Sequence, residues 1–105
     1  MAGNKGGCAG RFDFSNTSVC FVTAHLAAGF ANYDERNRDY EIIDQGLRFQ
    51  KNRSIADHDA VIWLGDFNYR IGLDNPSVRE LILQRDYRRL YDNDQVSHIA
   101  FSFFG

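Results

Sequence analysis

The chain has 105 residues, of which 44% are hydrophobic, 25% are charged and one is proline, so its composition is globular rather than disordered. The formal net charge of −2 gives no overall attraction to nucleic acid, whose binding requires the neutralisation of many phosphates. No apolar run approaches the roughly 20 residues that a transmembrane helix needs. The length suits one domain, and the sequence contains no internal repeat.

The first predicted elements are two strands that form an antiparallel hairpin. Residues 8–14 and 19–26 are rich in β-branched and aromatic side chains, and the polar stretch 15–18 between them favours a turn. Cys8 and Cys20 lie among apolar residues without metal-binding spacing. We interpret them as reduced core thiols, which indicates an intracellular protein.

The next predicted element is an amphipathic helix. Tyr40, Ile43 and Leu47 recur at a spacing that places them on one helix face, which we expect to be buried. The opposite face is expected to be a solvated surface with ion pairs that contribute little. Its charged residues are Glu35, Arg36, Arg38, Asp39 and Glu41.

A third strand and a second helix are predicted in the remainder of the chain. After a loop at 54–59, the apolar run 60–64 favours a strand buried on both faces. In the helix that follows, Asn75 can cap and Pro76 suits the first helical position. Residues 99–105 resemble another strand. Hairpins mixed with helical crossovers predict an α+β fold with sheets inside and helices outside. The buried stripe of the second helix should contain Val78, Leu81 and Ile82.

Polar side chains follow the predicted strands. Asp66 and Asn68 are two residues apart, so they would project from the same face if the strand continued past Leu64. An aspartate can orient or deprotonate a water, and an asparagine can donate hydrogen bonds to developing charge. His25 ends its strand, although a lone histidine is more often structural than catalytic. The histidine spacing matches no zinc motif.

The glycine-rich stretch 3–7 can be interpreted in two ways. Its glycines would let backbone amides approach a phosphate, and Lys5 adds a compact positive charge. The P-loop pattern is absent, and a flexible turn explains the same residues. The sequence by itself leaves both interpretations open.

Four stretches occur here in the order seen in the inositol polyphosphate 5-phosphatases: GNKGG at 3–7, TAHLAAG at 23–29, DERNRDY at 34–40 and WLGDFNYRI at 63–71. The chain therefore resembles that family over nearly its whole length, and most closely the synaptojanin-like enzymes. The resemblance implies the four-layer α/β/β/α sandwich shared with DNase I-like nucleases. Residues 1–105 would form a central fragment of such a domain.

The resemblance also implies an activity, the Mg²⁺-dependent removal of the 5-phosphate from phosphoinositide lipids such as phosphatidylinositol 4,5-bisphosphate. Carried over by position, Asp66 would activate the attacking water and Asn68 would help to hold the phosphoryl group. His25 would contact the scissile phosphate. The residues expected to bind other parts of the substrate are Asn4, Lys5 and Arg70.

Several family features are not found in this chain. The glutamate that binds Mg²⁺ is expected upstream of the loop at 3–7, and the P-x-W-C-D-R and S-D-H segments are expected downstream of residue 105. We therefore assign no metal ligand within the chain. We expect the isolated chain to be inactive, and to be poorly stable because strand edges and sheet faces would be exposed.

Two other functions stay open at this stage. A DNase I-like phosphodiesterase uses a similar G-D-x-N motif, and a non-catalytic remnant would retain the surface of the fold without its chemistry. The expected partner is a phosphoinositide headgroup, with no nucleic acid. Such a substrate implies a cytoplasmic enzyme in peripheral contact with membranes. The sequence does not identify the preferred phosphoinositide.

Overall fold

The computed structural model describes residues 4–97, so the predicted strand at 99–105 lies outside the described part. None of the helices within residues 4–97 has the length and apolar character that crossing a membrane requires. The chain divides into two compact units. The first unit contains Met1–Ala28 and Asp34–Asn68, and the second contains Gly29–Tyr33 and Tyr69–Gly105.

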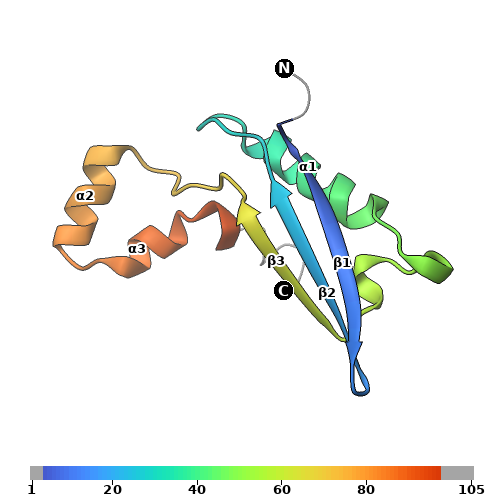
Figure 1. The fold of residues 1–105 in the computed structure, drawn as a ribbon. Helices are drawn as coiled ribbons and strands as arrows, with labels where there is room; N and C mark the ends of the chain where they lie inside the picture. Colours follow the sequence, from blue (N-terminus) through green and yellow to red (C-terminus); the bar gives the residue numbers. More distant parts are fainter. Residues whose placement is uncertain (1–3, 98–105) are drawn as a thin grey trace. The chain divides into compact units, whose positions relative to one another are not determined.

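The first unit is built on a three-stranded mixed sheet in the order β1-β2-β3 (Figure 1). Strands β1 (Gly6–Phe14) and β2 (Thr17–His25) form the predicted antiparallel hairpin, with Ser15 of the turn at a φ of 56°. Strand β3 (Ala60–Asp66) runs parallel to β2. A parallel pair needs a crossover, and helix α1 (Tyr33–Gly46) supplies it.

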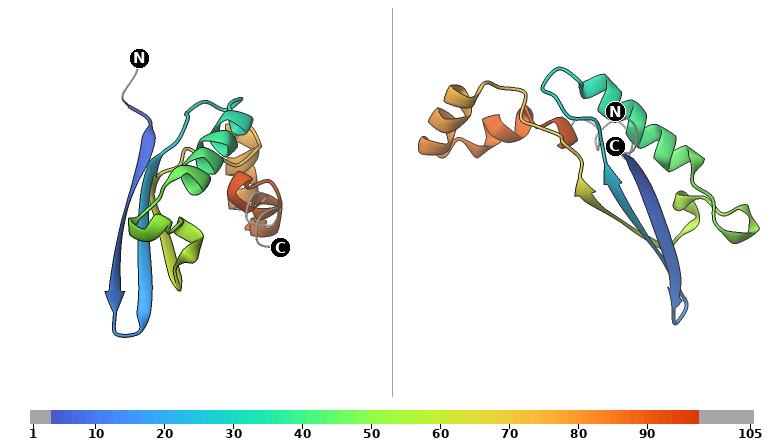
Figure 2. Two further views of the ribbon diagram at one scale, coloured as in Figure 1. Left: turned by 90° about the vertical axis from the view of Figure 1, so that its right-hand side faces the viewer. Right: turned by 45° about the horizontal axis from the view of Figure 1, so that its top comes forward.

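Helix α1 lies along one face of the sheet (Figure 2, left). The core beneath it consists of Cys20, Val22 and Ile55, and Ile43 and Leu47 pack against these residues as the helical spacing predicts. The rings of Tyr40 and Trp63 are also in contact, with centroids 4.8 Å apart. Two short 3₁₀ turns follow α1, η1 (Gln50–Asn52) and η2 (Ile55–Asp57), and the second lies within the predicted loop at 54–59.

Three predictions of burial in this unit are wrong. Arg36, expected on the solvated helix face, is 0% exposed. Cys8 is exposed because it lies opposite Thr23 in the register, on the sheet face turned away from α1, whereas Cys20 is buried as predicted. Strand β3 is not buried on both faces, because Ile62 and Leu64 are 44% and 46% exposed.

The sheet face turned away from α1 carries large apolar side chains. The rings of Phe12 and Phe21 stack there with centroids 5.7 Å apart. Ile62 lies beside Phe21 in the register, and Leu64 lies beside Thr23. All three of Phe12, Phe21 and Ile62 are more than a third exposed. The sheet therefore presents an apolar surface to solvent within the described residues.

The second unit contains α2 (Asn75–Leu83) and α3 (Tyr87–Asp92), where the sequence predicted one helix. Arg85, with a φ of 57°, lies between them. The cap of α2 is Asp74, whose carboxylate accepts from the Ser77 N–H at 2.8 Å, so the expected cap at Asn75 is one residue too late. In the predicted stripe Leu81 is buried, Val78 is half-buried and Ile82 is 49% exposed.

Candidate active site

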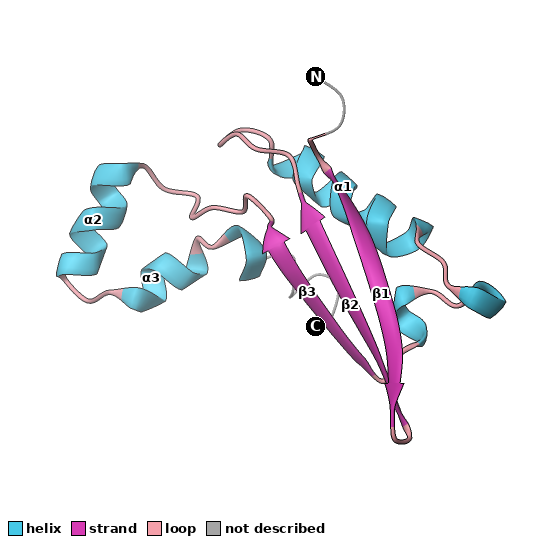
Figure 3. Cartoon of the chain, in the orientation of Figure 1, coloured by secondary structure: helices cyan, strands magenta, loops and turns pink. Residues whose placement is uncertain are grey.

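The ends of β2 and β3 and the start of β1 lie together at one edge of the sheet (Figure 3). Four of the predicted site residues lie at this edge. His25 ends β2, Asp66 ends β3, and the parallel register pairs them directly. Gly6, which begins β1, pairs with His25 from the other side. The exposed residues Asn4 and Lys5 immediately precede Gly6, so their loop enters the sheet at the same edge.

The close approach of β2 and β3 at this edge depends on Gly65. Its φ is 128°, a conformation that L side chains rarely adopt. A Cβ at this position would overlap the carbonyl oxygen of Ala24 and lie 3.1 Å from the Ala24 nitrogen. Only glycine therefore lets β3 place Asp66 beside His25, which explains the glycine before the acid.

The extended conformation does not persist to Asn68, contrary to the expectation that it would project with Asp66 as in a strand. Asn68 has a left-handed φ of 57° and its N–H donates to Asp66 Oδ1 at 3.1 Å. Its side-chain Nδ2 donates to the carbonyl oxygen of Leu26 at 2.8 Å. A turn closed by these bonds keeps Asn68 next to Asp66, because an aspartate readily bonds the backbone two residues ahead.

The acid and the imidazole face each other across the strand ends. His25 Nε2 lies 3.8 Å from Asp66 Oδ2, and the two side chains are 45% and 68% exposed. A substrate can therefore reach both groups. A carboxylate here can accept a proton from water, and the imidazole can donate a hydrogen bond to an anionic oxygen. The arrangement suits the transfer of a group that gains negative charge.

Arg70, the remaining predicted substrate-binding residue, belongs to the second unit. Its N–H donates to Gln95 Oε1 at 2.9 Å, and its carbonyl oxygen accepts from the Gln95 N–H at 3.0 Å. Its side chain is exposed. The structure does not assign Arg70 to the cluster of the first unit, and its role in substrate binding stays a prediction.

His58, to which the sequence gave no role, is a packing residue. It is 9% exposed, its Nε2 accepts from Arg11 Nε at 2.9 Å, and its Nδ1 lies 3.0 Å from the carbonyl oxygen of Ile55. The edge of its ring also contacts Phe49. His25 is therefore the exposed histidine of this unit, which supports its selection as the functional one.

Within residues 4–97, no group of three or more histidine, cysteine or acidic side chains is arranged to hold a metal ion. Asp66 and Asn68 nevertheless carry a carboxylate and an amide oxygen, the donor types that Mg²⁺ prefers. Asp66 and Asn68 could therefore supply part of a magnesium site but not all of its ligands. The expected main ligand upstream of the chain stays a prediction.

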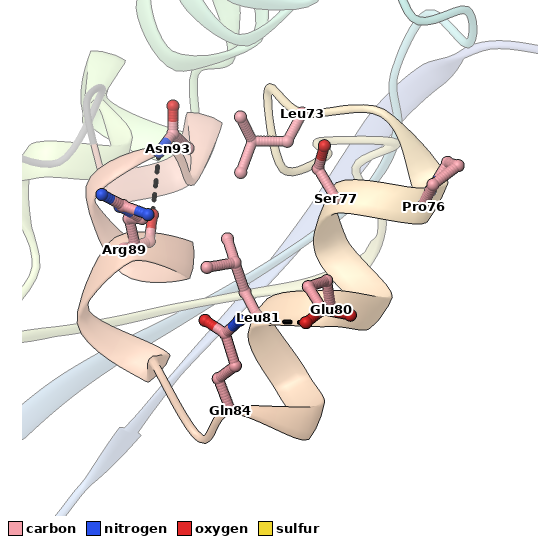
Figure 4. A pocket seen from close by; sticks show the side chains of 8 residues that line it. All are labelled: Leu73, Pro76, Ser77, Glu80, Leu81, Gln84, Arg89 and Asn93. Atoms are coloured by element: carbon pink, nitrogen blue, oxygen red, sulfur yellow. Dashed lines mark hydrogen bonds between the residues drawn. The ribbon is translucent and has the colours of Figure 1, made fainter.

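A cavity of about 600 Å³ lies elsewhere, between α2 and α3 in the second unit (Figure 4). Leu73 and Leu81 line it together with polar side chains, among them Gln84, whose Nε2 donates to Glu80 Oε1 at 2.9 Å. None of the predicted site residues lines this cavity. Its position gives no reason to move the candidate site away from the sheet edge.

Sequence reasoning missed the part played by the main chain of Leu26. Its N–H donates to the carbonyl oxygen of Asp66 at 3.1 Å, and its carbonyl accepts from Asn68 as described above. Leu26 is 1% exposed. No side-chain pattern reports such backbone bonds. One signal for this role of Leu26 is present in the sequence, which is that Leu26 directly follows His25.

The candidate site lies at the strand ends of a mixed sheet in an α+β architecture. Residues 1–100 match the model of the endonuclease/exonuclease/phosphatase family 2, and the chain belongs to that family. A crystal structure of the inositol polyphosphate 5-phosphatase domain of SPsynaptojanin, in complex with inositol (1,4)-bisphosphate and calcium, matches 95% of the chain with a TM-score of 0.86 and 50% identity. The predicted fold class is thereby confirmed.

Curated relatives carry the resemblance further. The chain is 52% identical over 97 residues to inositol-1,4,5-trisphosphate 5-phosphatase 1 of Schizosaccharomyces pombe, and 45% identical over 95 residues to human synaptojanin-2. These matches cover 92% and 90% of the chain but only 9% and 6% of the two relatives. The chain also spans 30% of the solved SPsynaptojanin domain. The predicted resemblance to synaptojanin-like 5-phosphatases is confirmed.

Proposed function

We propose that the chain supplies the acid, amide and imidazole of a phosphoinositide 5-phosphatase site, and that it acts within a complete catalytic domain. The observation that carries this proposal is the direct pairing of His25 with Asp66 at the strand ends, closed by the turn at Asn68. Three of the similar proteins are named as inositol phosphate or phosphoinositide 5-phosphatases, and these names support the substrate class.

In the proposed reaction, Asp66 accepts a proton from a water that attacks the 5-phosphate in line with the leaving oxygen. The bond from phosphorus to the inositol 5-oxygen breaks, and that oxygen takes a proton from solvent. His25 donates a hydrogen bond to a phosphoryl oxygen as negative charge grows. Asn68 fixes the Asp66 carboxylate through its N–H and contributes its amide to the phosphoryl group. Positioning and fixed donors account for much of the catalysis in phosphoryl transfer, and these three residues supply that part of it.

We further propose that Mg²⁺ is the metal of the complete domain. It would neutralise charge on the phosphoryl oxygens, with its main ligand outside this chain, and the Asp66 and Asn68 oxygens are donors that the chain could add. The calcium in the similar SPsynaptojanin structure supports a divalent cation in this family. Asn4, Lys5 and Arg70 are proposed to bind the other phosphates of the headgroup, since a lysine or arginine pairs readily with phosphate.

A lipid headgroup as substrate implies peripheral contact with a membrane, and we propose a cytoplasmic location at such surfaces. The preferred headgroup is to be found by experiment. Release of phosphate from a panel of phosphoinositides and soluble inositol phosphates would identify it. Equal rates on lipid and soluble substrates would contradict the need for membrane contact.

The test requires a complete catalytic domain. We define the completed domain as the SPsynaptojanin 5-phosphatase domain in which this chain replaces its matching segment, a swap favoured by the 50% identity and the TM-score of 0.86. The completed domain should release phosphate from phosphatidylinositol 4,5-bisphosphate in the presence of Mg²⁺. The 105-residue chain by itself should release none. Activity of the isolated chain, or nicking of plasmid DNA by the completed domain, would overturn the proposal.

A further inference from the structure

Helix α1 holds the loop after β2 through the main-chain N–H and carbonyl of one residue, Ala27. Arg36 Nη1 donates to the Ala27 carbonyl oxygen at 3.2 Å, and Asp39 Oδ2 accepts from the Ala27 N–H at 3.1 Å. The Arg36 side chain is 0% exposed and Ala27 is 7% exposed. A cation and an anion on neighbouring turns of one helix therefore hold both polar groups of one buried residue.

Leu26, the residue before Ala27, connects these two hydrogen bonds to the candidate site. Leu26 donates its N–H to the Asp66 carbonyl oxygen and accepts from Asn68 Nδ2. A shift of Ala27 would move the Leu26 carbonyl, and the Asn68 amide would lose its acceptor. Since Asn68 also donates its N–H to the Asp66 carboxylate, the shift would reach the acid as well.

We propose that Arg36 and Asp39 are positioning residues, which fix Asn68 and Asp66 in their reactive geometry through the main chain of Ala27 and Leu26. This inference rests on the proposed function for its kinetic consequence. Burial of a guanidinium is costly unless it is well bonded, and an apolar side chain would pack at position 36 at lower cost. If Arg36 fixes the loop beside the site, its role explains why a guanidinium is buried at position 36.

The experiment compares Asp39→Ala with Asp39→Asn in the completed domain. The alanine variant removes the acceptor of the Ala27 N–H, whereas the asparagine variant retains an oxygen that can accept it. Asp39→Ala should lower kcat by about 10-fold to 100-fold, the range that applies when hydrogen bonds orienting metal ligands are lost. KM should stay within about twofold because no headgroup contact is lost. Asp39→Asn should restore most of kcat.

Matched controls separate positioning from stability. Ile43→Val removes half-buried apolar volume from the same helix, at a residue that packs against the core of Cys20, Val22 and Ile55, and Glu41→Ala removes an exposed charge from it. Both should retain kcat at temperatures below their unfolding midpoints. Arg36→Lys, which keeps a charge but loses the planar donor, should reproduce the kcat effect of Asp39→Ala. Wild-type kcat in folded Asp39→Ala, or an equal loss in Ile43→Val, would overturn the inference.

A spectroscopic readout distinguishes the failure of this inference from the failure of the proposed function. In the ¹⁵N-labelled completed domain, Asp39→Ala should shift the side-chain NH₂ resonances of Asn68 and speed hydrogen exchange at the Leu26 amide, whereas Glu41→Ala should change neither. An inactive wild-type domain that shows these shifts would refute the proposed function and retain the positioning network. Unchanged Asn68 resonances in Asp39→Ala would refute the network even in an active domain.

Discussion

Gly65→Ala tests whether the close approach of β2 and β3 holds the site together. Gly65 has a φ of 128°, and an added Cβ would overlap the backbone oxygen of Ala24. The obstructing atoms are backbone rather than the end of a flexible side chain, so the strands must separate. Separation would break the bond from the Leu26 N–H to the Asp66 carbonyl oxygen.

The expected cost follows from two contributions. A non-glycine residue held in a sparsely populated backbone region costs about 1–3 kcal/mol, and the lost hydrogen bond costs about 1 kcal/mol, so the free energy of unfolding should fall by about 2–4 kcal/mol. Gly10→Ala is the matched control, because Gly10 lies in β1 of the same sheet and a Cβ there meets no atom within 4 Å. This control should be neutral or stabilising by about 0.5–1 kcal/mol.

The assay is urea unfolding of the completed domain followed by circular dichroism, with phosphate release measured on the same samples. Gly65→Ala should lower the urea midpoint and lose most activity at concentrations of urea where the Gly10→Ala domain is folded and active. An unchanged midpoint and full activity in Gly65→Ala would refute the claim that strand contact at Gly65 positions Asp66.

Three further predictions concern stability. Leu81 is 7% exposed and Leu83 is 79% exposed, so Leu81→Ala should lower the free energy of unfolding by about 2–5 kcal/mol and Leu83→Ala by less than about 0.5 kcal/mol; equal losses in urea titrations would contradict the packing of α2. Burial raises the pKa of the Asp44 carboxyl. The protonated carboxyl therefore favours the folded state below the ordinary pKa, and this stabilisation is lost as pH rises through the raised value. In Asp44→Asn, a plot of Tm against pH should lack this loss. Hydrogen bonds from the Ser18 N–H and hydroxyl lower the pKa of Asp59, so its stabilisation is present above about pH 3.9 and is lost as pH falls through the lowered value; Asp59→Ala should lower Tm at neutral pH more than in acid.

The elements of the first unit were largely predictable because their periodicity is strong. The hairpin, the helix and the third strand all form where the β-branched runs and the helical spacing indicate. Burial of the third strand was not predictable. An apolar run such as 60–64 favours a strand, but the run does not report what covers each face. Ile62 and Leu64 consequently lie exposed within the described residues.

The error at Arg36 was avoidable. Arg36 precedes Tyr40 by four residues, and Tyr40, Ile43 and Leu47 were the residues chosen for the buried face. Helical spacing therefore puts the arginine on the apolar face, where it meets the carbonyl oxygen of Ala27. Arg36 was assigned to the solvated face because it is charged, although its position in the helix places it on the apolar face. A charged residue on an apolar face is a signal for a buried polar bond.

The candidate site residues were selected by motif, whereas their geometry could not be predicted from the sequence. The sequence selected His25, Asp66 and Asn68, and the register places the first two side by side. The left-handed turn at Asn68 and the bonds to Leu26 depend on backbone conformation, which spacing alone does not define. The helix cap shows the same limit, since Asp74 and Asn75 are both good caps and only the structure selects Asp74.

The most direct test of the central claim is phosphate release from phosphatidylinositol 4,5-bisphosphate by the completed domain, measured with malachite green, with and without Asp66→Asn. The substitution keeps the shape of the side chain and removes the base. We expect Mg²⁺-dependent release by the wild-type domain and a loss of about 100-fold or more in the variant, the usual effect of removing a general base. Full activity in Asp66→Asn would contradict the proposed role of the acid at the end of β3.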